Sequence, residues 1–204
     1  MRDVIATKST SLALAEERKL MRQGYEFLDE KRMLLASEIF RQLTTYKACL
    51  AEMERVRRAA AEALAAAIER HGLEELQLAA PLAELRVPQW KRTLFLRAAS
   101  LQLVDDVATT AAPPQAQDVS PEAQSCRITF SHFVRIAARA ATIAANLRRL
   151  AAEYRRTERR AKTLENVLLP EVEDTLKHVD EELEASDQEE LVYTRSPRRS
   201  ESER

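Results

Sequence analysis

The chain has 204 residues, of which 32% are charged, 5% are aromatic and only 2 are glycine. This composition is typical of long helices, so a layered globular domain with a large core is not expected. The formal net charge of −1 also argues against a protein whose whole surface binds nucleic acid.

The first twenty residues contain Asp3, Glu16 and Glu17 and no apolar stretch of the signal-peptide kind, so the sequence predicts a cytoplasmic protein. The most apolar stretch, "IAARAATIAANL", is mostly alanine and carries Arg139, so no membrane insertion is expected. Cys49 and Cys126 lie far apart without metal-ligand spacing. They are expected to be small, buried or half-buried side chains.

A long helix is predicted from about Thr10 to His71, within an N-terminal segment of residues 1–72. This stretch has no proline, and its apolar residues recur at steps of three, four or seven. Ser9 or Thr10 can cap its start, and Gly72 can end it in a left-handed conformation. The predicted apolar seam consists of Met21, Tyr25, Leu28, Leu35, Ile39, Tyr46, Leu50, Met53, Val56, Ala60, Ala63 and Ala67.

Residues 73–121 are predicted to form a short middle segment. Its stretch "TLFLRAASLQLVDDV" is dense in strand-compatible residues, and either a small β-hairpin or a pair of short helical pieces fits it. After Gly72 no glycine is available for a tight hairpin turn. The stretch "ATTAAPPQAQDVSP" is predicted to be a loop.

A second long helix is predicted over residues 122–190. Ser120 is placed to cap it, with Pro121 at the first helical position and Glu122 in the first turn. Its predicted seam consists of Phe133, Ile136, Ala140, Ile143, Leu147, Leu150, Tyr154, Ala161, Leu164, Leu168, Val172, Leu176, Val179 and Leu183. Residues 191–204 end in "TRSPRRSESER", which has no apolar content to bury, so a disordered tail is expected.

Two narrow seams of this kind bury each other when the helices wind together. The predicted fold class is therefore all-α, a long antiparallel two-helix coiled coil with the two termini at one end. If the pairing begins near residue 70 against residue 130, Pro170 falls opposite Lys31.

Pro170 lies inside the second predicted helix, where a proline costs roughly 3 kcal/mol because it lacks an amide proton and its ring meets the carbonyl of Asn166. A restart of the helix at Pro170 is one interpretation, because Glu171, Glu173 and Asp174 suit a first turn. The apolar steps continue across the proline, which favours a continuous helix with a bend near Pro170.

No catalytic, cofactor-binding or metal-binding residue is predicted. Gly24 and Gly72 are too far apart to form a phosphate-binding loop. His71, His132 and His178 are isolated from one another. None is expected to have a companion three or four residues on that would complete a metal or catalytic pair.

Two charged runs are predicted to be helix surfaces. The acidic run "PEVEDTLKHVDEELEASDQEE" distributes its carboxylates around a helix, which favours a solvated or partner-facing face over acid–base chemistry. The basic run "RRLAAEYRRTERRAK" is interpreted as a charged collar facing protein or solvent, with a phosphate-tracking stripe as the alternative. Its basic residues are Arg148, Arg149, Arg155, Arg156, Arg159, Arg160 and Lys162.

The two ends of the chain also resemble a known family. Residues 7–39 contain Gly24, Leu28, Lys31, Arg32 and Leu35 in the order G-x-x-x-L-x-x-K-R-x-x-L. This segment resembles the opening helix of the D subunit of the V-type and archaeal-type rotary ATPases. The stretch "RRAKTLENVLLPEVEDTLKHVDEELEASDQEELVY", with Leu164, Glu165, Val167 and Pro170, is similar to the closing helix of that family.

The resemblance implies a noncatalytic central-stalk rotor that couples rotation in a hexamer of A and B subunits to ion transport by a membrane ring. It implies contact of the terminal ends of both helices with that hexamer, an F subunit along the shaft and a C subunit at the middle segment. No cofactor, no direct nucleotide and no nucleic acid is expected, and the protein would be peripheral to the membrane through the complex. The alternative is an unrelated coiled-coil scaffold or a membrane adaptor.

Overall fold

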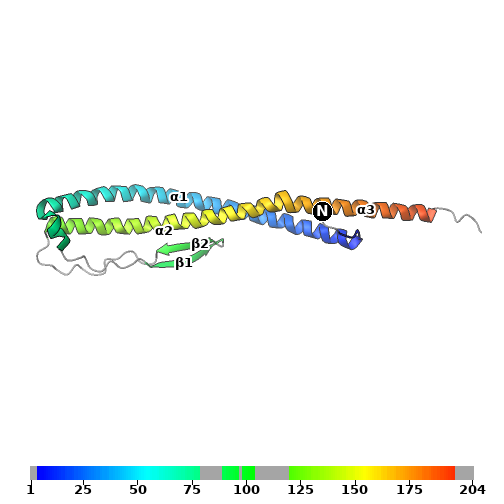
Figure 1. Ribbon diagram of the computed structural model, residues 1–204, viewed down its shortest axis with the longest axis horizontal. Helices are drawn as coiled ribbons and strands as arrows, with labels where there is room; N and C mark the ends of the chain where they lie inside the picture. The colour runs from blue at the N-terminus through cyan, green and yellow to red at the C-terminus, as the bar shows by residue number, and fades with distance from the viewer. Residues whose placement is uncertain (1–3, 79–88, 97, 104–119, 196–204) are drawn as a thin grey trace, which may run out of the picture. The chain divides into compact units, whose positions relative to one another are not determined.

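The computed structural model describes residues 4–78, 89–96, 98–103 and 120–195. In chain order its elements are α1 (Lys8–Leu78), β1 (Trp90–Phe95), β2 (Ala98–Leu103), α2 (Pro121–Thr163), the π-helix η1 (Leu164–Leu168) and α3 (Leu169–Arg195). Figure 1 labels the α-helices and the two strands. The predicted all-α fold with two long helical segments is confirmed, and the middle segment contains a small β-hairpin. Of the loop predicted over residues 108–121, residues 108–119 lie outside the described residues.

The described residues belong to two compact units. The terminal unit comprises Met1–Met33 with Arg155–Arg204, and the central unit comprises Leu34–Tyr154. Each unit therefore combines a part of α1 with a part of the second long helical segment.

The terminal unit is an antiparallel helix pair. Leu14, near the start of α1, packs against Val172, Leu176 and Val179 of α3. Further along α1, Gly24 lies beside Leu164, so positions advance along α1 as they recede along the other helix. This antiparallel order is the one that the two apolar seams predicted.

The central unit repeats this pairing with different side chains. Cys49 and Val56 of α1 pack against Ile136 and Ala140 of α2, with Tyr46, Met53, Phe133 and Ile143 around them. A second cluster joins Leu35, Leu150 and the hairpin residue Ala98. The hairpin is thus a third element of this unit, and its Ala98 side chain is only 4% exposed.

Both predicted seams are confirmed, because every seam residue that was predicted is buried or half-buried. The polar members of the interface were not predicted, since apolar periodicity does not include them. Thr157 is 2% exposed and fills the seven-residue gap between Tyr154 and Ala161. The other buried polar side chains are Lys31, Thr142, Asn146 and Thr175. Cys49 is buried and Cys126 half-buried, as expected.

The start of α1 differs from the prediction. Thr7, rather than Ser9 or Thr10, caps the helix, because its Oγ1 accepts a hydrogen bond of 3.1 Å from the amide of Thr10. Its carbonyl accepts another of 3.0 Å from Ser11. Thr10 is the third helical residue, the position whose amide a capping side chain reaches.

Gly72 takes a positive φ of 73° with ψ of 161°, angles that are not helical, so the first helix is broken at this residue, as predicted. A second helical piece follows the break and continues to Leu78, which was not predicted. A backbone conformation with positive φ and ψ near 160° is open essentially to glycine alone. Gly72 is therefore a corner within α1.

The second helical segment begins as predicted and ends later. Ser120 Oγ accepts a hydrogen bond of 3.3 Å from the amide of Ala123, and Pro121 is the first helical residue. The helix runs on to Arg195, so residues 191–195 are helical and not part of a disordered tail. Residues 196–204 lie outside the described residues.

A π-helical turn precedes Pro170. The amide of Leu169 bonds to the carbonyl of Leu164, five residues back, while Thr163 and Leu169 keep ordinary right-handed helical angles. The helix therefore continues through this region, as the apolar steps indicated, and does not restart. The π-turn itself was not predicted, although the sequence carries a signal for it. Three consecutive steps of four lead from Leu164 to Leu176.

Three steps of four residues would carry the seam about 120° around a regular α-helix. A π-turn contains more residues than an α-turn and takes up this drift. It also changes the hydrogen-bond pattern directly before the proline, where a regular α-helix would press the ring against a carbonyl. The four-residue spacing of the apolar side chains and the presence of Pro170 thus favour the same π-helical turn.

The predicted register was wrong. Arg70 contacts Glu122, not residue 130, at 3.1 Å. In the terminal unit, Glu173 accepts a hydrogen bond from Arg22, and Leu164 lies beside Gly24. Pro170, between these two positions, therefore lies opposite Arg22–Gly24 and not opposite Lys31.

Candidate interaction surfaces

The described residues offer no group of three or more histidine, cysteine, aspartate or glutamate side chains that could hold a metal ion. Two of the three histidines have a glutamate four residues on. His71 lies 3.7 Å from Glu75, and His178 lies 3.2 Å from Glu182. Each is a single pair on one helix, so neither assembles a ligand set or a catalytic dyad in a pocket.

Polar contacts join α1 to α3 across the terminal unit. Ser11 donates a hydrogen bond of 2.7 Å to Asp180, and Lys8 Nζ lies 3.8 Å from Asp187. Arg22 pairs with Glu173. These groups are substantially exposed, so each pair contributes at most about 1 kcal/mol and mainly fixes the register of the two helices.

An apolar arc follows the exposed side of α1 in the terminal unit. Leu12, Leu20 and Phe27 are 69%, 67% and 65% exposed. Steps of eight and seven residues keep these three side chains within about 80° of one another around the helix. Large exposed apolar side chains gathered on one helix face are a feature of protein–protein contact sites.

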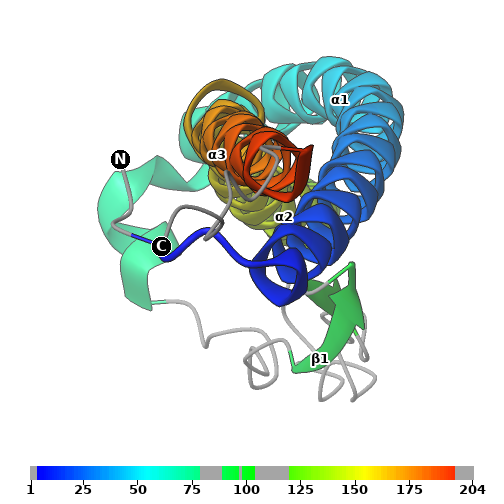
Figure 2. The same cartoon turned by 90° about the vertical axis from the view of Figure 1, so that its right-hand side faces the viewer.

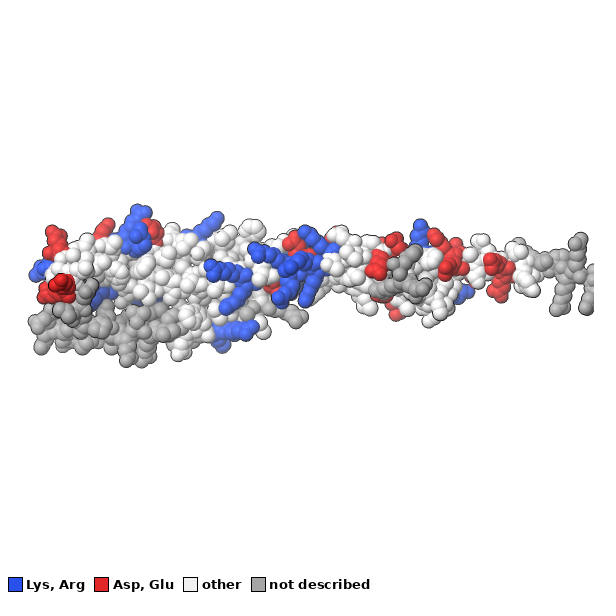
Figure 3. All heavy atoms as spheres, in the orientation of Figure 1, with Lys and Arg blue, Asp and Glu red and all other residues white. Residues whose placement is uncertain are grey.

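The exposed side of α3 is acidic instead. Its exposed carboxylates after Asp174 are Asp180, Glu181, Glu182, Glu184, Asp187, Glu189 and Glu190. Figure 3 shows acidic side chains gathered along this helix. The terminal unit therefore presents apolar chemistry on α1 and negative charge on α3.

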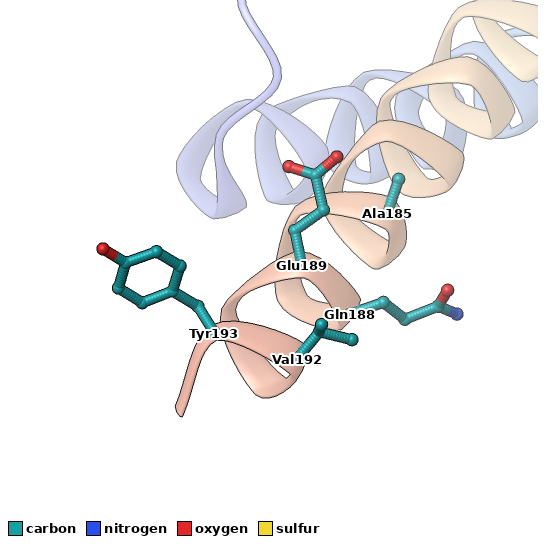
Figure 4. A pocket seen from close by; sticks show the side chains of 5 residues that line it. All are labelled: Ala185, Gln188, Glu189, Val192 and Tyr193. Atoms are coloured by element: carbon teal, nitrogen blue, oxygen red, sulfur yellow. The ribbon is translucent and has the colours of Figure 1, made fainter. Parts of the chain in front are cut away.

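The last turns of α3 extend past the contact with Lys8 and expose apolar side chains again. Leu191, Val192 and Tyr193 are 55%, 70% and 86% exposed. A shallow hollow of about 520 Å³ lies here, lined among the described residues by Ala185, Gln188, Glu189, Val192 and Tyr193 (Figure 4). All of these side chains come from one helix and spread outward, so the hollow is an open surface rather than a catalytic pocket.

Beside the π-turn, neighbouring charges and burial shift the pKa of one tyrosine. The Glu165 carboxylate, together with partial burial and Asp29, raises the pKa of Tyr25 above its usual value. Tyr25 is neutral at physiological pH and can donate a hydrogen bond to Glu165.

The predicted basic collar lies on α2. Its exposed members are Arg148 and Arg149 in the central unit, and Arg155, Arg156, Arg159, Arg160 and Lys162 in the terminal unit. Lys162 pairs with Glu158 at 3.1 Å. Figure 3 shows lysine and arginine side chains gathered over this stretch. These side chains are exposed, which suits contact with protein, solvent or phosphate alike.

In the central unit, α2 holds the hairpin through side chains that were not predicted to have a role. Asn146 accepts a hydrogen bond of 2.7 Å from the amide of Leu101 and donates one of 2.8 Å to its carbonyl. Trp90 Nε1 donates a hydrogen bond of 2.9 Å to Thr142. Thr142 and Asn146 are four residues apart and so lie on one face of α2. Two polar residues four positions apart in an alanine-rich stretch are the sequence feature from which this role could have been predicted.

The hairpin turn is made without glycine. Leu96 has a positive φ of 47°, which few large residues adopt. Its side chain packs against the cluster of Leu35, Ala98 and Leu150. This packing offsets the strain and explains how the middle segment forms a tight turn without glycine.

Within the part of the chain that the structure describes, no helix is both long and apolar enough to cross a membrane.

The chain was then compared with known proteins. The model of the family described as the ATP synthase D subunit matches residues 10–196. The V-type ATP synthase D subunit of Thermotoga neapolitana is 24% identical over 193 residues, which is 92% of this chain and 93% of the relative. The A-type ATP synthase D subunit of Thermococcus sibiricus is 27% identical over 194 residues, or 90% and 87% of the two chains.

A third relative, the V-type ATP synthase D subunit 2 of Treponema pallidum, is 24% identical over 194 residues, or 93% and 91% of the two chains. The family match spans both long helical segments and the hairpin between them. The resemblance noted at the two ends of the sequence thus extends over nearly the whole chain, which belongs to the family of ATP synthase D subunits.

Proposed function

We propose that this chain is the noncatalytic central-stalk rotor subunit of a V/A-type ATPase or ATP synthase. ATP is hydrolysed or made in a hexamer of A and B subunits, and rotation of this chain couples that reaction to ion transport across the membrane. The protein is cytoplasmic and peripheral to the membrane through the complex. The observation that carries the proposal is the family match over residues 10–196, which includes both paired helices.

The partners are assigned from the same family resemblance. The terminal ends of both helices enter the A and B hexamer, the F subunit binds along the helix pair, and the C subunit binds the middle segment. The terminal unit supports the first assignment because its surface is suited to protein contact. It exposes large apolar side chains on α1, such as Leu20 and Phe27, and again at the end of α3, where Tyr193 is 86% exposed.

The chemistry of the terminal unit differs around its circumference, and this difference supports a coupling role. A rotor changes the nucleotide affinity of a site only if it contacts that site differently at each angular position. The apolar arc of Leu12, Leu20 and Phe27 on α1 and the acidic side of α3 provide such unequal contacts. As the rotor turns, one catalytic interface meets the apolar arc while another meets carboxylates.

The π-turn before Pro170 adds an irregular backbone to this asymmetry. Val167, within the turn, is 55% exposed, and none of the η1 residues is buried. We assign to this turn a role in contacting the hexamer, since Glu165, Asn166 and Val167 are exposed and only Leu164 and Leu168 are half-buried in the seam.

Co-expression with A and B subunits from the same source tests the rotor assignment. The chain is expected to co-purify with the hexamer and to give sustained ATP hydrolysis. A scaffold or membrane adaptor would leave the hexamer without this chain and its turnover unchanged, and that result would contradict the proposal.

A pair of proline variants tests the role of the irregular turn. Pro170→Ala combined with deletion of Asn166 removes both causes of the π-turn, and the coupled hydrolysis rate is expected to fall while the chain still binds. Pro121→Ala is the matched control, because Pro121 is an exposed proline at the first position of α2. An unchanged coupled rate in the Pro170 variant would mean that the turn has no part in coupling.

A further inference from the structure

The hairpin has two edges, and α2 closes one of them. Asn146 is 7% exposed, and its amide group makes two hydrogen bonds to the backbone of Leu101, at 2.7 and 2.8 Å. These are the bonds that a neighbouring strand would make to β2. Because the side chain replaces a strand there, the outward backbone groups of Leu101 in β2 are satisfied by the helix.

The strand register then fixes which backbone groups of β1 point outward. In an antiparallel pair, residues alternate between those that bond across the ladder and those whose amide and carbonyl face away from it. Leu101 faces away, toward Asn146, and its partner in the register is Arg92. Arg92 must therefore also face away from the ladder, on the opposite edge. Trp90 and Leu94, two residues to either side, do the same.

This outer edge of β1 has no hydrogen-bonding partner among the residues that the structure describes. Figures 1 and 2 both show the hairpin standing out to one side of α2. β1 is exposed along most of its length, and Leu94 is 74% exposed. An open strand edge with exposed apolar side chains is a template for pairing with another strand.

The charge of the edge indicates which strand would fit. Lys91 and Arg92 are exposed on β1, and the described hairpin residues include no aspartate or glutamate. Like charges on neighbouring strands are unfavourable, and opposite charges favour pairing. A basic or neutral strand is therefore a poorer partner for β1 than an acidic one.

We propose that the outer edge of β1 binds an extended acidic segment of a protein partner, which adds to the hairpin as a third strand. The backbone groups of Trp90, Arg92 and Leu94 provide the pairing, and Lys91 with Arg92 provide the charge preference. Asn146 and Thr142 act as positioning residues, because Asn146 holds the outward backbone groups of Leu101 in β2 and Thr142 holds the Trp90 side chain of β1 on α2. This mode of recognition is β-strand addition.

Peptide binding to the full-length chain tests the proposal. The probe is a blocked peptide of alternating glutamate and valine, and the matched probe has lysine in place of glutamate. The acidic peptide is expected to slow amide hydrogen exchange at Trp90, Arg92 and Leu94 by roughly three- to tenfold, the factor implied by a net backbone hydrogen bond. The alternate residues Lys91 and Thr93 already bond within the ladder and should change little.

Two variants provide the controls. Leu94→Pro removes one outward amide without removing a ladder bond and is expected to abolish protection at the edge. The double variant Lys91→Glu with Arg92→Glu keeps the backbone and should reverse the preference, so that the lysine peptide binds better. An unchanged Leu101 amide signal in each variant would verify that the hairpin remains docked.

Other outcomes would overturn the proposal. Equal protection by both peptides would remove the acidic preference, and no protection by either would remove the site. Slow exchange of the three amides in the chain alone would mean that another segment of the same chain covers the edge. Protection that rises with protein concentration without peptide would mean that a second copy does so.

Discussion

The terminal and central units use the same antiparallel helix pairing but complete it in different ways. In the terminal unit Leu14 packs against Val172, Leu176 and Val179, with exposed polar contacts alongside. In the central unit α2 is rich in small residues, and a hairpin supplies additional apolar and polar contacts through Ala98 and Leu101. In the terminal unit, two helices with larger side chains form the core by themselves. In the central unit, the alanine-rich helices are joined in the core by the hairpin as a third element.

The largest expected effect comes from the cluster where the hairpin meets both helices. Leu35 is 0% exposed, so Leu35→Ala should lower the free energy of unfolding by about 2–5 kcal/mol. Its neighbour Leu34 is 46% exposed, and Leu34→Ala should change the free energy of unfolding by no more than about 0.5 kcal/mol. Denaturant unfolding measures both, and equal losses would show that the central unit does not depend on this cluster.

The hydrogen bonds between Asn146 and the hairpin should produce the next largest effect. Asn146→Ala leaves the amide and carbonyl of Leu101 without partners, at a cost of about 1–3 kcal/mol. We expect faster hydrogen exchange at Leu101 and a red-shifted fluorescence of Trp90 as its ring becomes more exposed. Asn166→Ala, at an exposed asparagine of the π-turn, is the control from the terminal unit and should change neither signal.

The two glycines should respond in opposite directions to the same substitution. Gly72→Ala places a side chain at φ 73°, which costs about 1–3 kcal/mol, although nothing lies within 4 Å of the added carbon. Gly24 is helical, and its added carbon would make an ordinary contact of 3.8 Å with Leu164. Gly24→Ala should therefore stabilise the terminal unit by about 0.5–1 kcal/mol. Thermal unfolding of the two variants would contradict this interpretation if both shifted the same way.

The smallest expected effect is a pH dependence on the surface of the central unit. Hydrogen bonds from Arg57 and Arg58 lower the pKa of Glu54 to about 2. Because the folded pKa is below the unfolded one, the stabilisation is present above pH about 4.5 and is lost as the pH falls toward 2. Circular dichroism across this range should show less loss of helix in Glu54→Gln than in the parent chain. The same loss of helix with falling pH in both chains would mean that the contacts of Glu54 with Arg57 and Arg58 do not contribute to stability.

Much of this molecule follows directly from residue spacing. The apolar seams predicted both long helices, their antiparallel pairing and most of the buried apolar positions, although not Leu14. The reason is that a residue's place on a helix face depends only on its position in the chain. The local cap at Ser120 was equally predictable, and the family resemblance came from residues at the two ends.

Tertiary structure decided the features that depend on which side chain meets which. The predicted register was wrong because sliding one repetitive seam along the other by a turn or two buries a similar apolar surface. Contacts such as that of Arg22 with Glu173 select one register among these alternatives. Asn146 and Thr142 gained their role only when the hairpin came against α2, and Leu96 could form the turn only because its side chain packs there. Periodicity specifies a face, but the partner of that face depends on contacts between segments distant in the chain.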